Sequence, residues 1–189
     1  PAGIFMPMAN ALGLGEKIDH AVFQLVKELS KKPGNIPVAI NLAMSVFSHA
    51  DALVEFNQLL EFFKQSSTGL CVEASHTIIE RYPAMCVEVA DSVRKAGHTF
   101  GIDNLNLGLS MDILQTVRPD YVKINSRTLH DMSKGDIPAG FHALLTLTKT
   151  MDIRLIAVGV ESEEVRENLQ QLGVTTMQGN HINALEVVL

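Results

Sequence analysis

The chain has 189 residues, of which 47% are hydrophobic and 19% charged, and its formal net charge is −6. This apolar content is enough for a hydrophobic core, so the composition excludes an intrinsically disordered chain. The acidic balance excludes a protein that coats nucleic acid or contacts an acidic membrane, since both tasks need a basic surface. No run approaches the roughly 20 apolar residues that cross a bilayer, and no signal peptide begins the chain.

The two cysteines, Cys71 and Cys86, lie among apolar neighbours. Buried reduced thiols of this kind are typical of a cytoplasmic protein rather than of a disulfide-stabilised one. The chain begins with Pro1 rather than Met. We therefore expect a cytoplasmic piece of a longer protein, which can itself be anchored in a membrane.

The first half of the chain alternates amphipathic helices with short apolar strands. A helix is expected over 16–32 and a strand over 36–43, followed by a helix over 51–64 and a strand over 69–74. Apolar residues recur at helical spacing in both helices and predict their buried faces. These residues are Ile18, Val22, Leu25 and Leu29 in the first helix and Leu53, Phe56, Leu60 and Phe63 in the second.

The second half continues the alternation. A helix over 83–97 starts at Pro83 and ends at Gly97, which suits the residue preferences of helix ends. The elements that follow are a strand over 98–103, a helix near 110–117, a strand over 119–125, a helix over 138–151, a strand over 153–160, a helix over 162–173 and a strand over 174–179. Apolar strands separated by helices predict an α/β fold with a parallel sheet, either an open doubly wound sheet or a (β/α) barrel.

Polar side chains follow the apolar core of nearly every predicted strand. The series is Asn41, Glu73, Asp103 with Asn104, Lys123 with Asn125, Glu161 after Val158, and Gln178. The carboxyl ends of parallel strands share one edge, where ligand sites are built. Oxygen ligands suit Mg²⁺, Mn²⁺ or Ca²⁺, and a lysine can orient a phosphate. A single Asn or Asp at a strand end is better explained as turn chemistry, and Lys123 as a surface cation. Glu73 is the exception, because it closes an apolar strand where an unpaired carboxylate would be costly.

The chain resembles the EAL family of cyclic-di-GMP phosphodiesterase domains over nearly its whole length. The segments that carry the resemblance are "PAGIFMPMANALGLGEKID", "INLAMSVF", "CVEAS" at the Glu-x-Thr-Glu position, "IDNLNLGLS" at Asp-Asp-Phe-Gly-Thr-Gly-Tyr-Ser, "VKIN" at Lys-Ile-Asp, "AVGVE" at Ala-Glu-Gly-Val-Glu and "MQGN" at the closing Gln-Gly. The resemblance implies a TIM-like (β/α) barrel. Residues 1–189 would form a partial, degenerate EAL domain with about six of the eight strands, because the Glu-Ala-Leu segment and the first two strands would precede Pro1.

The resemblance also assigns roles to individual residues. The family's metal ligands fall on Asn41, Glu73 and Asp103, its phosphate- or water-orienting lysine on Lys123, and its late glutamine on Gln178. Together with Glu161, the residues Asn41, Lys123 and Gln178 form the expected ligand-binding set.

Three positions of the family's reaction centre are changed in this chain. Asn104 replaces the second aspartate of the metal pair, His76 replaces a glutamate that steadies the loop after Asp103, and Val158 replaces the presumed general base. Val158 has no lone pair, and general-base help is worth about 10²–10⁴-fold in rate. We also expect Asn106 to take a backbone geometry that the family's glycine accepts more readily. The altered positions predict loss of catalysis, with at most a vestigial, weakly occupied metal site.

The expected function is therefore a catalytically inactive receptor for cyclic-di-GMP in bacterial signalling. It needs no cofactor, although a single Mg²⁺, Mn²⁺ or Ca²⁺ ion fits the ligand set. A preceding GGDEF-type or sensor domain, a protein partner or a second copy of the chain would receive the signal. Two alternatives stay open: a nucleotide-independent docking module for RNA turnover, motility or biofilm control, using a helix face around Phe56, Leu59 and Phe63, and residual phosphodiesterase activity.

Overall fold

The computed structural model describes residues 8–9, 11–31, 37–66, 68–106, 111–133 and 139–182. The chain divides into two compact units, residues 1–100 (unit 1) and 101–189 (unit 2). The strands are ordered β1-β2-β3-β4-β5-β6 along the sheet, and the pairs β1–β2, β3–β4, β4–β5 and β5–β6 are parallel. A doubly wound sheet reverses its strand order at a switch point. Strands that follow chain order without a reversal instead match the wall of a (β/α) barrel.

From residue 15 to residue 95, unit 1 alternates helices with two parallel strands. In chain order they are α2 (Gly15–Leu29), β1 (Val38–Asn41), α3 (Ser45–Ser48), α4 (Ala50–Lys64), β2 (Leu70–Ser75), α5 (His76–Arg81) and α6 (Pro83–Lys95). β3 (Thr99–Asp103) then leads into unit 2. The register pairs Val38 with Leu70 and Asn41 with Glu73.

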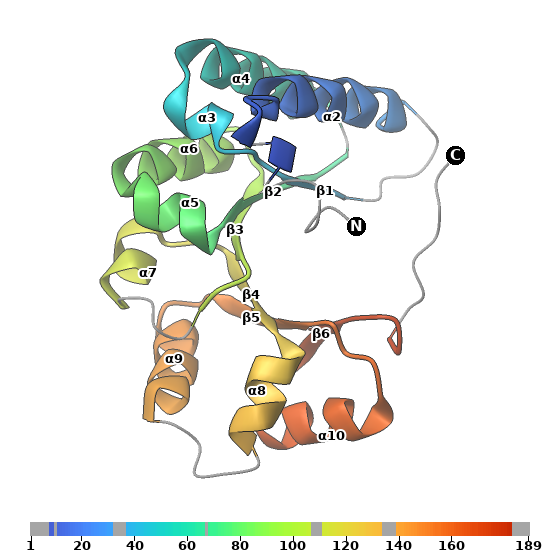
Figure 1. Ribbon diagram of the computed structural model, residues 1–189, viewed down its shortest axis with the longest axis vertical. Helices are drawn as coiled ribbons and strands as arrows, with labels where there is room; N and C mark the ends of the chain where they lie inside the picture. Colours follow the sequence, from blue (N-terminus) through green and yellow to red (C-terminus); the bar gives the residue numbers. More distant parts are fainter. Residues whose placement is uncertain are drawn as a thin grey trace. The chain divides into compact units, whose positions relative to one another are not determined.

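The helices of unit 1 supply a core of large aromatic side chains. Figure 1 shows α2 and α4 side by side, and the ring centroids of Phe23 and Phe56 lie 6.1 Å apart where the two helices meet. Phe56, Leu59 and Phe63 are all 0% exposed. The helix face that the sequence offered as a docking surface is therefore core. The docking alternative for this face is wrong and the buried face that the helical spacing predicts is confirmed, because α2 covers part of it and α6 also contacts α4.

The buried face of α2 also differs from the one expected. Asp19, Phe23 and Val26 point inward, whereas Leu25 is 58% exposed. The apolar spacing favoured the stripe through Leu25 because an aspartate is rarely buried without partners. Asp19 has such partners, so the helix is rotated from the orientation that the hydrophobic pattern predicts.

Unit 2 completes the series of parallel strands. Its elements are α7 (Met111–Val117), β4 (Tyr121–Asn125), α8 (Ser126–Ser133), α9 (Ala139–Thr150), β5 (Arg154–Val158), α10 (Glu163–Gln171) and β6 (Thr176–Gln178). In Figure 1, α8 and α10 lie side by side. Close packing inside the sheet requires glycine at 101, because a Cβ there would stand 2.3 Å from the ring of Tyr121.

Three short helices were not expected from the sequence. α3, α5 and α8 have only four, six and eight residues, and each begins at or soon after the end of a strand. One or two turns are too short for a hydrophobic period to be recognised. The longer predicted elements are confirmed with boundary shifts of a few residues.

The structure also places the two cysteines and shows the length and character of the helices. Both described thiols are free, with Cys86 buried and Cys71 half-buried. Burial raises the pKa of Cys86 to about 12, so this thiol is unreactive at neutral pH. Among the residues that the structure describes, no helix has the length and apolar character needed to traverse a bilayer.

Candidate functional site

In unit 1, the ends of β1 and β2 bring two of the predicted ligands together. Asn41 and Glu73 are paired in the parallel register as the last and the fourth residues of their strands. The backbone N–H of Leu42 donates to the carbonyl of Glu73 at 2.9 Å, which continues the pairing past Asn41. The Asn41 side chain is exposed, whereas Glu73 is only 2% exposed. The amide therefore faces solvent beside a carboxylate that is almost completely covered.

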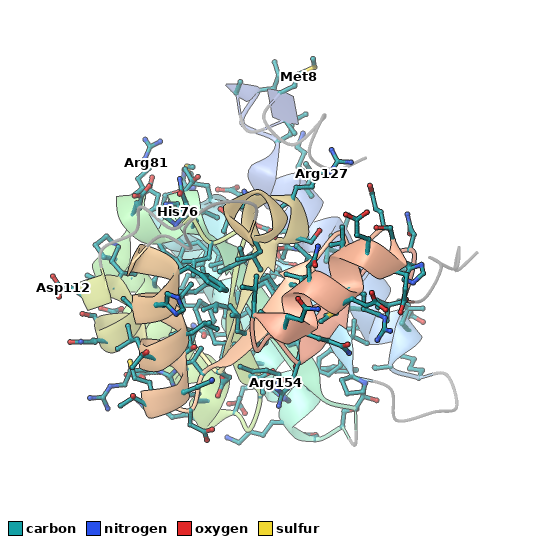
Figure 2. The ribbon with its side chains drawn as sticks, turned by 90° about the horizontal axis from the view of Figure 1, so that it is seen from below. Met8, His76, Arg81, Asp112, Arg127 and Arg154 are labelled. Carbon is teal, nitrogen blue, oxygen red and sulfur yellow. The ribbon has the colours of Figure 1, made fainter. Side chains whose placement is uncertain are left out.

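His76 follows β2 as the first residue of α5. Its Nε2 atom lies 3.3 Å from an Oε1 atom of Glu80, one helical turn further on, and its side chain is 12% exposed. Figure 2 labels His76 on the same short helix as Arg81. The imidazole that replaces the family's glutamate thus contacts an acid of its own helix.

In unit 2, the ends of β3 and β4 bring Asp103 next to Lys123. Ile102 pairs with Val122, so the next residues along the two strands are Asp103 and Lys123. The N–H of Leu105 donates to the Lys123 carbonyl at 2.8 Å and holds the start of the following loop against β4. Both side chains are half-buried, a setting in which a carboxylate or an ammonium interacts with a charged ligand more strongly than in bulk water.

The loop after Asp103 turns at Asn104, whose φ is +53°. Asparagine tolerates the left-handed region better than other non-glycine residues. The left-handed backbone geometry that the sequence predicted at Asn106 therefore occurs two residues earlier in the described part of the loop.

Three strand ends of unit 2 form a row of uncharged side chains. Asn125 of β4 pairs with Val158 of β5, and Val158 pairs with Gln178 of β6. Val158 is half-buried between the two amide-bearing positions, which are exposed. Asn125 stands at the position of the aspartate in the family's Lys-Ile-Asp segment. This additional loss of charge was not predicted from the sequence.

Gln178 is held in place by a close approach of two backbones. The N–H of Val160 donates to the carbonyl of Gln178 at 3.1 Å. A Cβ atom at Gly179 would stand 2.3 Å from the backbone N and O of Val160. Only glycine fits there, so the sequence "QG" is a packing requirement as well as a family motif.

The start of α8 connects the same strand ends through side chains. The Ser126 hydroxyl, on a residue that is 1% exposed, donates to the Gly159 carbonyl at 2.6 Å, and the Asn125 Oδ1 atom accepts the N–H of Arg127 at 2.9 Å. The Arg127 guanidinium donates to Glu161 at 2.9 Å. Glu161, an expected ligand-binding residue, is therefore engaged in an exposed ion pair that screening makes weak.

Arg127 was missed by sequence reasoning, although its position two residues after the "VKIN" strand end was the available signal. In Figure 2, Arg127 and Arg154 lie at opposite ends of unit 2. Arg154 begins β5 and Arg127 follows β4, so the first marks the amino ends of the strands and the second the carboxyl ends where the site residues gather.

Each unit carries one carboxylate and one amide among the positions expected to bind metal. In the part of the chain that is described, no group of three His, Cys, Asp or Glu side chains could hold a metal. Of the positions to which the resemblance assigns metal ligands, Glu73 and Asp103 carry carboxylates, whereas Asn41 and Asn104 carry neutral amides. Two bound dications repel each other and need bridging carboxylates to offset that repulsion.

The comparisons with known proteins agree on one family. The EAL domain family model matches residues 1–184. The bifunctional diguanylate cyclase/cyclic di-GMP phosphodiesterase MucR of Pseudomonas aeruginosa is 25% identical over 184 residues, which cover 94% of this chain and 27% of MucR. The chain therefore spans about a quarter of the length of this curated relative.

Solved structures match the fold closely. The S helix-GGDEF-EAL structure of Vibrio cholerae LapD bound to c-di-GMP has a TM-score of 0.84 and 23% identity, covering 96% of this chain and 45% of that one. The FimX EAL domain from Pseudomonas aeruginosa bound to c-di-GMP has a TM-score of 0.78 and 19% identity, covering 97% and 76%. At these identities the likeness shows the fold. It confirms a TIM-like barrel of the EAL type, with six strands among the described residues.

Proposed function

This chain belongs to the EAL domain family, and on that basis we propose that it binds cyclic-di-GMP as a receptor without hydrolysing it. The observation that carries the proposal is the row formed by Asn125, Val158 and Gln178 at the ends of β4, β5 and β6. None of these three side chains can accept a proton from water near neutral pH. A general base contributes about 10²–10⁴-fold to the rate of such reactions.

The charge of the metal ligands supports the same conclusion. A second dication is disfavoured with an amide in place of a carboxylate at Asn104, so both metal-bound nucleophile formation and stabilisation of the departing oxygen are weakened. A single Mg²⁺, Mn²⁺ or Ca²⁺ ion held by carboxylate and amide oxygens would instead attract a phosphate. In that role it contributes affinity rather than catalysis.

Each unit, considered by itself, offers groups suited to phosphate oxygens. Lys123 in unit 2 offers a half-buried ammonium, and Gln178 an exposed amide at the end of β6. In unit 1, the exposed Asn41 amide offers a donor and an acceptor. These groups interact with charged ligand oxygens without any step of bond cleavage.

A GGDEF-type domain is the proposed neighbour in the longer protein. MucR is named as both a diguanylate cyclase and a phosphodiesterase, and the LapD structure contains a GGDEF segment before its EAL segment. A nucleotide bound by this chain would then change the position or activity of that neighbouring domain, which makes the chain a regulatory module.

Calorimetric titration of the purified chain with cyclic-di-GMP tests the binding half of the proposal. We expect saturable heat that is strengthened by Mg²⁺. Cyclic-di-AMP, which keeps the two phosphates and changes the bases, is the matched control ligand. Absence of heat with micromolar cyclic-di-GMP, both with and without Mg²⁺, would show that the chain is not a receptor.

A turnover assay tests the second half. The chain is incubated with cyclic-di-GMP and Mn²⁺, and linear dinucleotide is separated by chromatography. We expect no product above the level of a sample without protein. Metal-dependent product formation would establish a working phosphodiesterase and reject the inactive-receptor proposal.

Nucleotide-independent docking is a weaker candidate. The face suggested for it, around Phe56, Leu59 and Phe63, is fully buried. A docking role therefore needs another surface.

A further inference from the structure

We propose that Asp19, on helix α2, is a positioning residue that holds Asn41 in its ligand-facing orientation at the end of β1. The inference rests on the proposed function for its purpose, since Asn41 is one of the groups offered to the nucleotide or its metal ion. The structural part of the inference does not depend on that function: the buried Asp19 carboxylate fixes the backbone immediately after Asn41.

The geometry comes from two hydrogen bonds that cross from α2 to the β1–α3 loop. One carboxylate oxygen of Asp19 accepts the backbone N–H of Ala43 at 3.0 Å, 24 residues further along the chain. The other accepts the hydroxyl of Ser45 at 2.5 Å. Asp19 is 2% exposed and Ser45 is 5% exposed, so both contacts are shielded from water. Hydrogen bonds to a charged acceptor are stronger than those between neutral groups.

These contacts leave the residues after Asn41 little freedom. The N–H of Leu42 is bound to the Glu73 carbonyl at 2.9 Å, and the N–H of Ala43 is bound to Asp19. The first residue after Asn41 is thus tied to the neighbouring strand and the second to a helix. With both anchors in place, the Asn41 side chain starts from one backbone conformation at the end of β1.

The position of Asp19 in α2 is costly for stability, which argues for a purpose beyond packing. Its neighbours on the buried face, Phe23 and Val26, are apolar. Burial raises the pKa of Asp19, while the hydrogen bonds from Ser45 and Ala43 lower it and the nearby Glu55 and Glu16 raise it. A raised pKa in the folded state means that the ionised carboxylate opposes folding at neutral pH. An apolar residue would suit the helix better but could not hold the loop.

A purely structural role predicts a different pattern of effects. If Asp19 only satisfies two polar groups, its loss should weaken the fold as any core truncation does and leave the Asn41 side chain unchanged. If it positions Asn41, the disturbance should be local to the β1–α3 loop. Val26→Ala is the matched control, because Val26 is 3% exposed on the same face of α2 and lies seven residues from Asp19.

The experiment uses the ¹⁵N-labelled 189-residue chain and the variants Asp19→Ala, Asp19→Asn, Ser45→Ala and Val26→Ala. The readouts are the side-chain amide signals of Asn41, assigned by their loss in Asn41→Ala, and the hydrogen-exchange rate of the Ala43 amide. The dissociation constant for cyclic-di-GMP with Mg²⁺ is measured on the same samples. Asp19→Asn is the conservative variant, because its side-chain oxygen still accepts the Ala43 N–H.

In Asp19→Ala we expect the Asn41 signals to move or broaden, the Ala43 amide to exchange about tenfold faster or more, and the dissociation constant to rise about tenfold, the scale of one lost charge-assisted hydrogen bond. Asp19→Asn should keep the Asn41 signals, the Ala43 exchange rate and the dissociation constant close to those of the unaltered chain. Val26→Ala should lower the unfolding midpoint and leave the Asn41 signals in place.

Asn41 signals that stay unchanged in Asp19→Ala, or that move equally in Val26→Ala, would overturn the inference. If Asp19→Ala does not fold, Ser45→Ala decides by the same spectroscopic criterion, since it removes only one of the two hydrogen bonds. If the unaltered chain binds no cyclic-di-GMP, the proposed function fails. The signals of Asn41 and Ala43 still decide the positioning role in that case.

Discussion

Val158 is paired with Gln178 across β5 and β6, so an isopropyl group stands beside an amide at the strand ends of unit 2. On the other side of Val158, β4 presents Asn125, a second amide. Three neighbouring strands therefore end without an ionisable side chain at these paired positions. The amides of this row can form hydrogen bonds with a charged ligand. They cannot abstract a proton as a general base does.

Restoring the missing acids should restore turnover. Val158→Glu supplies a general base, and Asn104→Asp supplies a charge to the metal ligands and tolerates the φ of +53° at that residue. We expect the double variant to release linear dinucleotide from cyclic-di-GMP with Mn²⁺ at least about 10²-fold faster than the unaltered chain, the lower end of general-base effects.

The matched control for this gain is Val158→Gln combined with Asn104→Asp. Glutamine has the size of glutamate and lacks its basicity. Equal rates in the Glu and Gln versions would show that the carboxylate at 158 is not what the chain lacks.

Lys123→Ala should weaken cyclic-di-GMP binding. Lys123 is half-buried beside Asp103 in the β3–β4 pairing, and loss of a charged contact there should raise the dissociation constant about tenfold or more. Titration calorimetry measures this change. Lys149→Ala, which removes an exposed cation in the last turn of α9, should leave the affinity unchanged. Equal affinity of Lys123→Ala and the unaltered chain would remove Lys123 from the ligand site.

Gly179→Ala should destabilise the β5–β6 end of unit 2. The new Cβ atom would stand 2.3 Å from the backbone of Val160, which cannot move aside as a flexible side chain can. We expect a loss of about 1–3 kcal/mol in the free energy of unfolding, measured in urea. Gly69→Ala is the control, because a Cβ there meets only Pro37 at 3.7–3.8 Å, an ordinary contact. An unchanged free energy of unfolding in Gly179→Ala would contradict the close approach of Gly179 to the Val160 backbone.

Stability should fall as the solution is acidified, and His98 should account for part of the loss. Both ring nitrogens of His98 are buried and have no hydrogen-bond partner among the described residues, and the ring packs edge-on against Phe63 with centroids 6.3 Å apart. Burial lowers the pKa of His98 from its ordinary value of 6.5. The unfolded chain therefore binds a proton more readily, so stability is full above pH 6.5 and falls as the pH drops below it.

Urea midpoints across this pH range measure the effect. His98→Phe keeps an aromatic ring against Phe63 and removes the titrating group, so its midpoint should depend less on pH between neutrality and mild acid. His142→Phe, on the outer surface of α9, serves as the control and should keep the full dependence. An unchanged pH dependence in His98→Phe would show that other groups cause the acid loss.

The alternation of apolar strands and helices was enough to predict the α/β class, the longer elements and the polar residue at the end of each strand. These features depend on local patterns of hydrophobicity and on turn chemistry, which neighbouring residues in the sequence determine. The resemblance supplied the barrel, which the solved structures confirm, and the expected roles of Asn41, Glu73, Asp103 and Lys123, which stay predictions. The pairing of Asn41 with Glu73 and of Val158 with Gln178 then followed from parallel register.

Tertiary structure alone decided the features that depend on contacts between distant segments. Asp19 turns inward because Ala43 and Ser45 meet its carboxylate, and this contact rotates α2 away from the face that its apolar residues predict. Phe56 is core because another helix covers it, and Gly179 is required because Val160 passes 2.3 Å from where its Cβ would be. A hydrophobic period records the average preference of a helix, whereas a buried hydrogen bond or a backbone contact is specific to one pair of residues and appears only when the chain has folded.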